Sequence, residues 1–177
     1  MLPNAKIKQK KKLDFLCILI KVRPMSSVLI GKPGLYCGVK QFTIFIDQQH
    51  VSLNNTLSLI NANGLTLIAF SSDKIADCLI LRMVTNYTDK FKGLLEKNGI
   101  YFGERPVLGV EFLHSNDIVK IIDVITSAEI KVHYFYPMLS QHNNKLGSIL
   151  CIEDINLGAK ALSQTGITVI SQNELDR

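Results

Sequence analysis

Polar and apolar residues alternate along one stretch of the chain and repeat with a helical period along the next. The segment KQFTIFI (40–46) alternates as a half-buried strand does. The segment 51–63 places its apolar residues on one helical face, and Gly64 follows it as a C-terminal cap. Two β-rich runs come next, LTLIAFS (65–71) and CLILRMV (78–84), separated by the polar SDKIAD. This pattern predicts a strand, a helix and two more strands.

A second helix and a fourth strand complete a unit. Asn86 is a residue type that caps helix N-termini, apolar residues follow at Phe91 and Leu95, and Gly99 is placed to end the helix. The segment IYF (100–102) then predicts a short fourth strand. The order of elements is βαββαβ.

The same order repeats in the second part of the chain. PVLGVEFL predicts a strand, and Ile118, Ile121, Ile122 and Ile125 mark one helix face. IKVHYFYPM and LGSILCI predict two strands around the polar QHNNK loop. A helix then ends at Gly166, and ITVI is the last strand. LINANGLTLIAFS aligns with VITSAEIKVHYFY, and LLEKNGIYF with ALSQTGITVI, at an offset of about 65 residues, which is typical of two copies of a small domain.

The repeat predicts an α+β protein with two ferredoxin-like domains. A βαββαβ unit forms a four-stranded antiparallel sheet with both helices on one face, which leaves the other face and the edges exposed. A second copy can cover the bare face or extend the sheet across an edge. We expect a basic, poorly ordered N-terminal extension at 1–39, a first domain at 40–104 and a second at 105–177.

Basic charge is concentrated in the extension. Residues 1–40 carry nine Lys and Arg against one Asp, a net of +8, whereas residues 41–177 carry eleven against fourteen acidic residues, a net of −3. The folded part therefore lacks the basic face expected of a nucleic-acid-binding protein. Within the extension, Phe15–Ile20 is shorter than the apolar core of a secretory signal. Met25 is an alternative start, and no apolar run of the sequence is long enough to cross a membrane.

Candidate chemistry is sparse. The sequence contains no GxSxG and no phosphate loop, and the GKPG segment lacks the rest of a phosphate-loop motif, so we expect no enzyme and no cofactor. Asp73 and Asp77 read as solvated turn carboxylates. The four histidines, at positions 50, 114, 133 and 142, are dispersed and predict no metal site. The four cysteines form no regular framework and indicate free thiols in a reducing compartment, the cytoplasm.

The segment HYFYP (133–137) offers an aromatic strand. Tyr134 and Tyr136 lie on one face of it, and His133 and Phe135 on the other. Aromatic platforms that bind nucleic acid combine such residues with clustered basic side chains, which are missing nearby. We therefore expect this face to pack between the two domains.

From about residue 40 to the C-terminus the chain resembles the stand-alone tandem ACT-domain proteins. The resemblance rests on VKQFTIFI, INANGLTLIAFS, LLEKNGI, RPVLGVEF and the terminal VISQNELDR. It implies a regulatory protein that binds a small molecule, most often an amino acid, where two ACT domains meet. In such proteins, backbone groups of the turn between the first strand and first helix hold the ligand, and helix N-termini favour its anionic end.

The resemblance places two candidate ligand-binding turns on this sequence. The family commonly has a glycine just before the first leucine of the helix; here the first turn has Val51, whose branched side chain disfavours positive φ. The second has Asn116 and Asp117, which tolerate positive φ and cap helices well, so it is the favoured site. The predicted ligand-binding residues are Asp47, Gln48, Gln49, His50, Val51, Ser52 and Leu53 in the first turn, and His114, Ser115, Asn116, Asp117 and Ile118 in the second.

Two hypotheses about function follow. The first is a non-catalytic sensor that binds an amino acid at ACT–ACT interfaces and acts on a partner protein. The second is a structural or protein-interaction module whose ligand-binding turns have degenerated, because both turns lack the glycine. Both hypotheses expect a homodimer or a protein partner.

Overall fold

A computed structural model of the chain describes residues 38–47, 53–75, 78–139 and 145–176, all within the compact unit Gly31–Arg177. We call the described chain up to Val107 the N-terminal half, and the chain from Leu108 onward the C-terminal half. The elements are β1 (Val39–Asp47), α2 (Leu53–Ala62), β2 (Leu67–Ile75), β3 (Cys78–Thr85), α3 (Thr88–Lys97), β4 (Phe102–Phe112), α4 (Asp117–Ser127), β5 (Val132–Pro137), β6 (Leu146–Ile152), α5 (Ile155–Gln164), β7 (Thr168–Ile170) and α6 (Gln172–Leu175).

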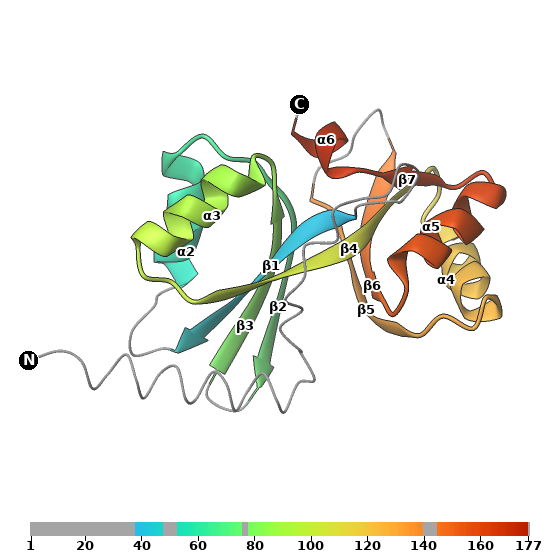
Figure 1. Ribbon diagram of the computed structural model, residues 1–177, viewed down its shortest axis with the longest axis horizontal. Helices are drawn as coiled ribbons and strands as arrows, with labels where there is room; N and C mark the ends of the chain where they lie inside the picture. Colours follow the sequence, from blue (N-terminus) through green and yellow to red (C-terminus); the bar gives the residue numbers. More distant parts are fainter. Residues whose placement is uncertain (1–37, 48–52, 76–77, 140–144, 177) are drawn as a thin grey trace, which may run out of the picture. The chain divides into compact units, whose positions relative to one another are not determined.

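Both halves have the ferredoxin-like strand order. Among the described residues the strands follow the order β2-β3-β1-β4-β6-β5, and β7 pairs with β4. The N-terminal half therefore reads β4-β1-β3-β2, and the C-terminal half reads β7-β4-β6-β5, with every pairing antiparallel. Helices α2 and α3 lie beside the first set of strands, and α4 and α5 beside the second (Figure 1). The predicted fold class is confirmed.

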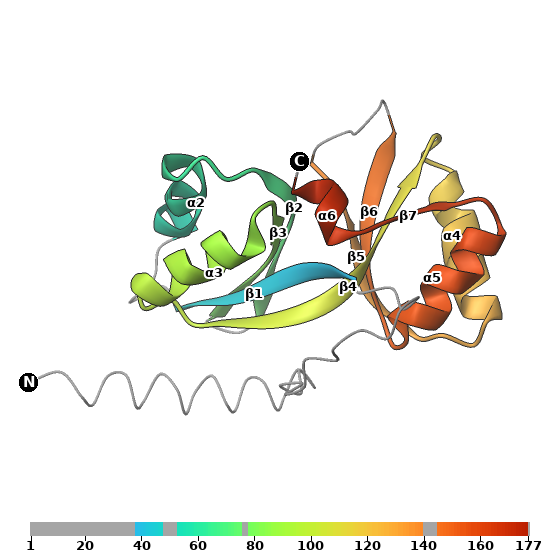
Figure 2. The same cartoon turned by 45° about the horizontal axis from the view of Figure 1, so that its top comes forward.

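A single strand belongs to both halves. The prediction of two strands, at 100–102 and 106–113, was wrong, because β4 runs unbroken from Phe102 to Phe112. Its first part pairs with β1 and its second part with β6 and β7 (Figure 2). Pro106, predicted as the first residue of a strand, lies within β4 opposite Lys40, whose N–H donates to the side chain of Gln172. The predicted domain boundary at 104/105 thus falls inside a continuous strand.

Among the described residues, three hydrophobic clusters stabilise the fold. The first lies between the N-terminal half's strands and helices, where Phe42 packs edge-on against Phe91 with ring centroids 5.0 Å apart. The second lies in the equivalent place in the C-terminal half and contains Ile121 and Leu150. The third joins residues from the opposite faces of the strands of both halves, such as Val84 and Ile149. The bare faces predicted from the repeat therefore pack against each other.

Several helix ends follow the prediction. Gly64, Gly99 and Gly166, which follow α2, α3 and α5, all have positive φ. Asp154 is the N-cap of α5, and its carboxylate accepts the N–H groups of residues 156 and 157. A left-handed backbone is unfavourable for residues with a Cβ atom, so glycine suits these positions.

Two local predictions were wrong. Asn86 does not cap α3; its side chain accepts the N–H of Thr66 at 2.7 Å, and Tyr87 precedes the helix instead. Strand β2 continues through the polar stretch as far as Ile75, because each of these residues pairs with β3. Asp73 therefore lies in a strand and pairs with Arg82, while Asp77 lies outside the described residues. None of the described helices is long and apolar enough to cross a membrane.

Candidate ligand-binding turns and the inter-sheet cluster

The first predicted turn follows β1. Asp47 ends the strand and pairs with Cys78 in the register of β1 and β3. Leu53 begins α2 and packs against the first hydrophobic cluster. The remaining predicted residues of this turn, Gln48, Gln49, His50, Val51 and Ser52, lie outside the described residues.

The second predicted turn joins β4 to α4 at the equivalent position of the C-terminal half. His114, Ser115 and Asn116 are exposed, whereas Ile118 is half-buried against the second hydrophobic cluster. Asn116 has φ −70° and makes no side-chain cap, so the expected glycine-like backbone is not adopted here. Among the described non-glycine residues only Tyr87 and Glu129 have positive φ.

The carboxylate of Asp117 organises this turn. Its Oδ2 accepts the N–H of His114 at 3.0 Å, and its Oδ1 lies 2.9 Å from Lys120 Nζ. The bond from Lys120, followed by the bond from the His114 N–H, lowers the pKa of the Asp117 carboxyl below its usual value. A backbone donor in the favoured turn is therefore already bound to an anion that the chain itself supplies.

A polar cluster lies among the apolar residues between the two sets of strands; we call it the inter-sheet cluster. Gln41 is fully buried on β1, and its Nε2 donates to Tyr134 Oη at 2.9 Å and to Thr43 Oγ1 at 3.1 Å. Its Oε1 accepts the hydroxyl of Tyr136 at 2.8 Å. Because Gln41 is in the N-terminal half and both tyrosines are in the C-terminal half, these bonds join the halves through a buried interface.

Two arginines flank the same cluster. The Arg82 guanidinium carbon lies 4.3 Å from the centroid of the Tyr134 ring, and the group also pairs with Asp73. Arg105 Nη1 donates to the Sγ atom of Cys151, which is buried, at 3.1 Å. Burial is the main cause that raises the pKa of both Tyr134 and Tyr136, so each hydroxyl stays protonated and able to donate.

The sequence predicted the two tyrosines of this cluster. The face of Tyr134 and Tyr136 was expected to pack between the domains, and it does. Gln41, Arg82 and Arg105 were missed. A usable signal was present for Arg82, because a lone charge inside the apolar run CLILRMV requires a buried partner.

Other candidate residues do not converge. His114 and His133 are exposed, and His50 and His142 lie outside the described residues. In the described part of the chain, no group of three or more His, Cys, Asp or Glu side chains could hold a metal ion. Cys78 and Cys151 are both buried, and the other two cysteines lie outside the described residues.

Comparison with known proteins supports the fold. The sequence matches no protein-family model, and no curated protein is similar to it in sequence. Among solved structures, protein BT0572 from Bacteroides thetaiotaomicron superposes with a TM-score of 0.71 at 18% identity, covering 80% of this chain and 97% of that one. The ligand-free regulatory subunit of aspartate kinase from Thermus thermophilus superposes with a TM-score of 0.52 at 12% identity, covering 73% and 93%. At these identities the likeness shows a shared fold.

Proposed function

We propose that this chain is a non-catalytic regulatory protein of the tandem ACT type, which binds an amino acid at the turns that precede α2 and α4. The observation that carries the proposal is the repeated strand–turn–helix arrangement in two ferredoxin-like halves. The fold that it shares with a regulatory subunit of aspartate kinase is consistent with that role. The buried free thiol of Cys151 supports a reducing compartment, and the cytoplasm is the one we propose.

The chemistry of the second turn supports an amino-acid ligand. The N–H of His114 already binds a carboxylate, that of Asp117, close to the N-terminus of α4. The α-carboxylate of an amino acid is the same chemical group and would compete for this donor. Asp117, once released, would lie beside the ligand and pair with its ammonium group. Ligand binding therefore replaces the Asp117 carboxylate at the His114 N–H with the carboxylate of the ligand. The charge of Lys120 stays paired.

Thermal unfolding with each of the twenty amino acids tests the proposal first. A ligand present at 100 times its Kd stabilises the folded state by about 2.7 kcal/mol, which raises the Tm of a chain of this size by about 5–10 °C. Calorimetry then measures the Kd of each amino acid that raises the Tm. If none of the twenty raises the Tm, amino-acid binding is refuted.

A pair of variants locates the ligand. Asp117→Ala removes both the carboxylate that competes with the ligand and the group that would pair with the ligand's ammonium. The Kd of the ligand therefore changes. Addition of the ligand should shift the NMR signal of the His114 amide. Asp123→Ala is the matched control, because Asp123 is an exposed residue of the same helix. An unchanged Kd in Asp117→Ala, with no ligand-induced shift at His114, would place the ligand elsewhere.

A second candidate function is a protein-interaction module that has lost its ligand. The same bond from His114 to Asp117 favours it, because a permanent internal carboxylate could replace the ligand altogether. Light scattering with and without amino acids distinguishes the two functions. A homodimer or partner complex that forms equally well without any amino acid supports the interaction module, whereas an amino-acid-dependent change of assembly supports the sensor.

A further inference from the structure

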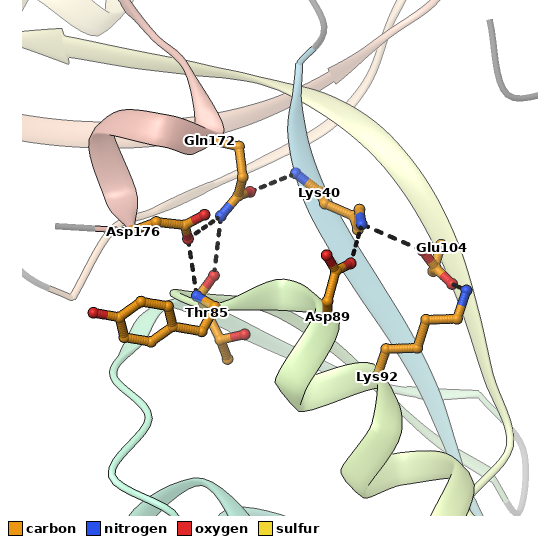
Figure 3. A network of polar contacts seen from close by, with 8 residues as sticks. Lys40, Thr85, Asp89, Lys92, Glu104, Gln172 and Asp176 are labelled. Atoms are coloured by element: carbon orange, nitrogen blue, oxygen red, sulfur yellow. Dashed lines mark hydrogen bonds and ion pairs between the residues drawn. The ribbon is translucent and has the colours of Figure 1, made fainter. Parts of the chain in front are cut away.

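The last residues of the chain return to the N-terminal half. We call Ser171–Asp176, which contains α6, the C-terminal clasp. Gln172 Oε1 accepts the N–H of Lys40 at 3.0 Å, and its Nε2 donates to the carbonyl of Thr85 at 3.4 Å. These contacts reach the start of β1 and the end of β3 (Figure 3). Gln172 in the clasp thus contacts residues that precede it in the sequence by 87 and 132 positions.

The clasp also supplies an acceptor just before α3. Asp176 Oδ1 accepts the N–H of Tyr87 at 2.8 Å, and it accepts Gln172 Nε2 at 2.9 Å (Figure 3). Tyr87 is the N-cap residue of α3, has φ 46° and makes no side-chain cap of its own. A left-handed backbone is unfavourable for tyrosine and is held in place by its surroundings. The carboxylate of Asp176 is one of those surroundings, and its charge suits the N-terminal end of a helix.

The clasp makes few buried contacts with the rest of the fold. Helix α6 has four residues, too few to be helical without tertiary contacts. Its own capping box, between Ser171 and Glu174, is exposed to solvent, and Leu175 is its one side chain that packs against the third hydrophobic cluster. Such a segment, with few buried contacts, opens at a lower free energy than the core strands do.

Outside the buried inter-sheet cluster and the third hydrophobic cluster, the described residues also connect the halves in three places, one of which is the clasp. The first is the continuous strand β4. The second joins β2 to the chain after β5, where the N–H of Leu139 donates to the carbonyl of Ile68 at 2.7 Å. The third is the clasp, which lies at the start of β1 and α3. The chain itself is continuous through β4, and the bond from Leu139 is accompanied by a β-bridge between Ala69 and Met138, so of these three places the clasp is the one that can be released without breaking a strand pairing.

We propose that the C-terminal clasp is a latch: closed, it holds the N-terminal end of α3 and the start of β1 to the C-terminal half, and open, it releases these two contacts while the core stays packed. Opening removes the acceptors of the Lys40 and Tyr87 N–H groups together. A partner or ligand that binds either state shifts the balance between them. The latch does not depend on the amino-acid site proposed above.

Hydrogen exchange of the full chain, followed residue by residue by NMR, tests the latch. In the double variant Gln172→Ala/Asp176→Ala, the Lys40 and Tyr87 amides should exchange at least about fivefold faster than in the wild type, because each loses its acceptor. The amides of α4 and α5 should keep their wild-type rates. Asn173→Ala is the matched control, because Asn173 is an exposed residue of the same helix.

A conservative variant separates the latch from general destabilisation. Asp176→Asn keeps an oxygen that accepts the Tyr87 N–H, so it should restore the exchange rate of that amide to within about twofold of the wild type. Unchanged rates at Lys40 and Tyr87 in the double variant would overturn the latch. Equal acceleration throughout α4 and α5 would also overturn it, since the clasp would then be part of the global fold.

Discussion

The inter-sheet cluster makes a quantitative prediction about how strongly the two halves are coupled. Tyr136 is 5% exposed and donates to Gln41, which is fully buried. Tyr136→Phe removes the donor and leaves the Gln41 oxygen unpaired, which costs about 1–3 kcal/mol. Gln41→Leu leaves the hydroxyls of Tyr134 and Tyr136 without this partner, and we expect it to cost about 2–4 kcal/mol.

The double variant measures the interaction itself. Gln41→Leu/Tyr136→Phe removes both members of one hydrogen bond. It therefore leaves fewer buried polar groups unpaired than the two single variants leave when their effects are added. We expect the double variant to be less destabilised than that sum by about 1–2 kcal/mol, within the range measured for residues in contact. This coupling energy belongs to a bond between the N-terminal and C-terminal halves.

Urea unfolding followed by far-UV circular dichroism is the assay, because the chain has no tryptophan to report by fluorescence. Tyr87→Phe is the control: its side chain is half exposed, so loss of its hydroxyl should change the free energy of unfolding by less than about 0.5 kcal/mol. Additivity of the two single variants to within about 0.3 kcal/mol would refute the reasoning, because residues that share a bond are expected to couple.

Three further predictions concern pH and packing. Burial raises the pKa of Tyr136 above its ordinary value of 10.0, so the folded chain should lose stability as the pH rises above that value. Tyr136 should contribute about 1.4 kcal/mol per pH unit to this slope, and urea titrations near pH 11 should show the slope reduced in Tyr136→Phe. Phe42→Ala removes a fully buried ring that packs on Phe91 and should cost about 3–5 kcal/mol in thermal unfolding. At Gly158 an added Cβ would lie 2.4 Å from Ile152 Cδ1, so Gly158→Val should cost about 1–3 kcal/mol by calorimetry.

The candidate site was only partly predictable. The turn before α4 could be found from the sequence, because a strand pattern, a polar stretch and a helix pattern follow each other there. The hydrogen bond from His114 to Asp117 could not, since Asn116 and Asp117 are both suitable helix caps by residue type. Only the structure assigns the carboxylate of Asp117 to that backbone donor.

The sequence by itself determined the type of most elements and the repeat of their order. Alternation and helical periodicity depend on which side of a strand or helix each residue faces, and this local property is visible in a single segment. Phe42 and Ile121 therefore fit these patterns as core residues, and both are buried in the structure. The glycines after α2, α3 and α5 were also predictable, because the positive φ that ends a helix is a local property that glycine allows.

The tertiary structure alone decided how the two copies combine. Whether the chain forms two strands here or the single strand β4 depends on β1 pairing with its first part and β6 with its second. Likewise, the partners of Gln41 and Tyr87 lie about 90 residues away, so no local pattern contains them. Pairings of this kind form only when distant segments of the chain meet, and they turn two repeated units into one fold.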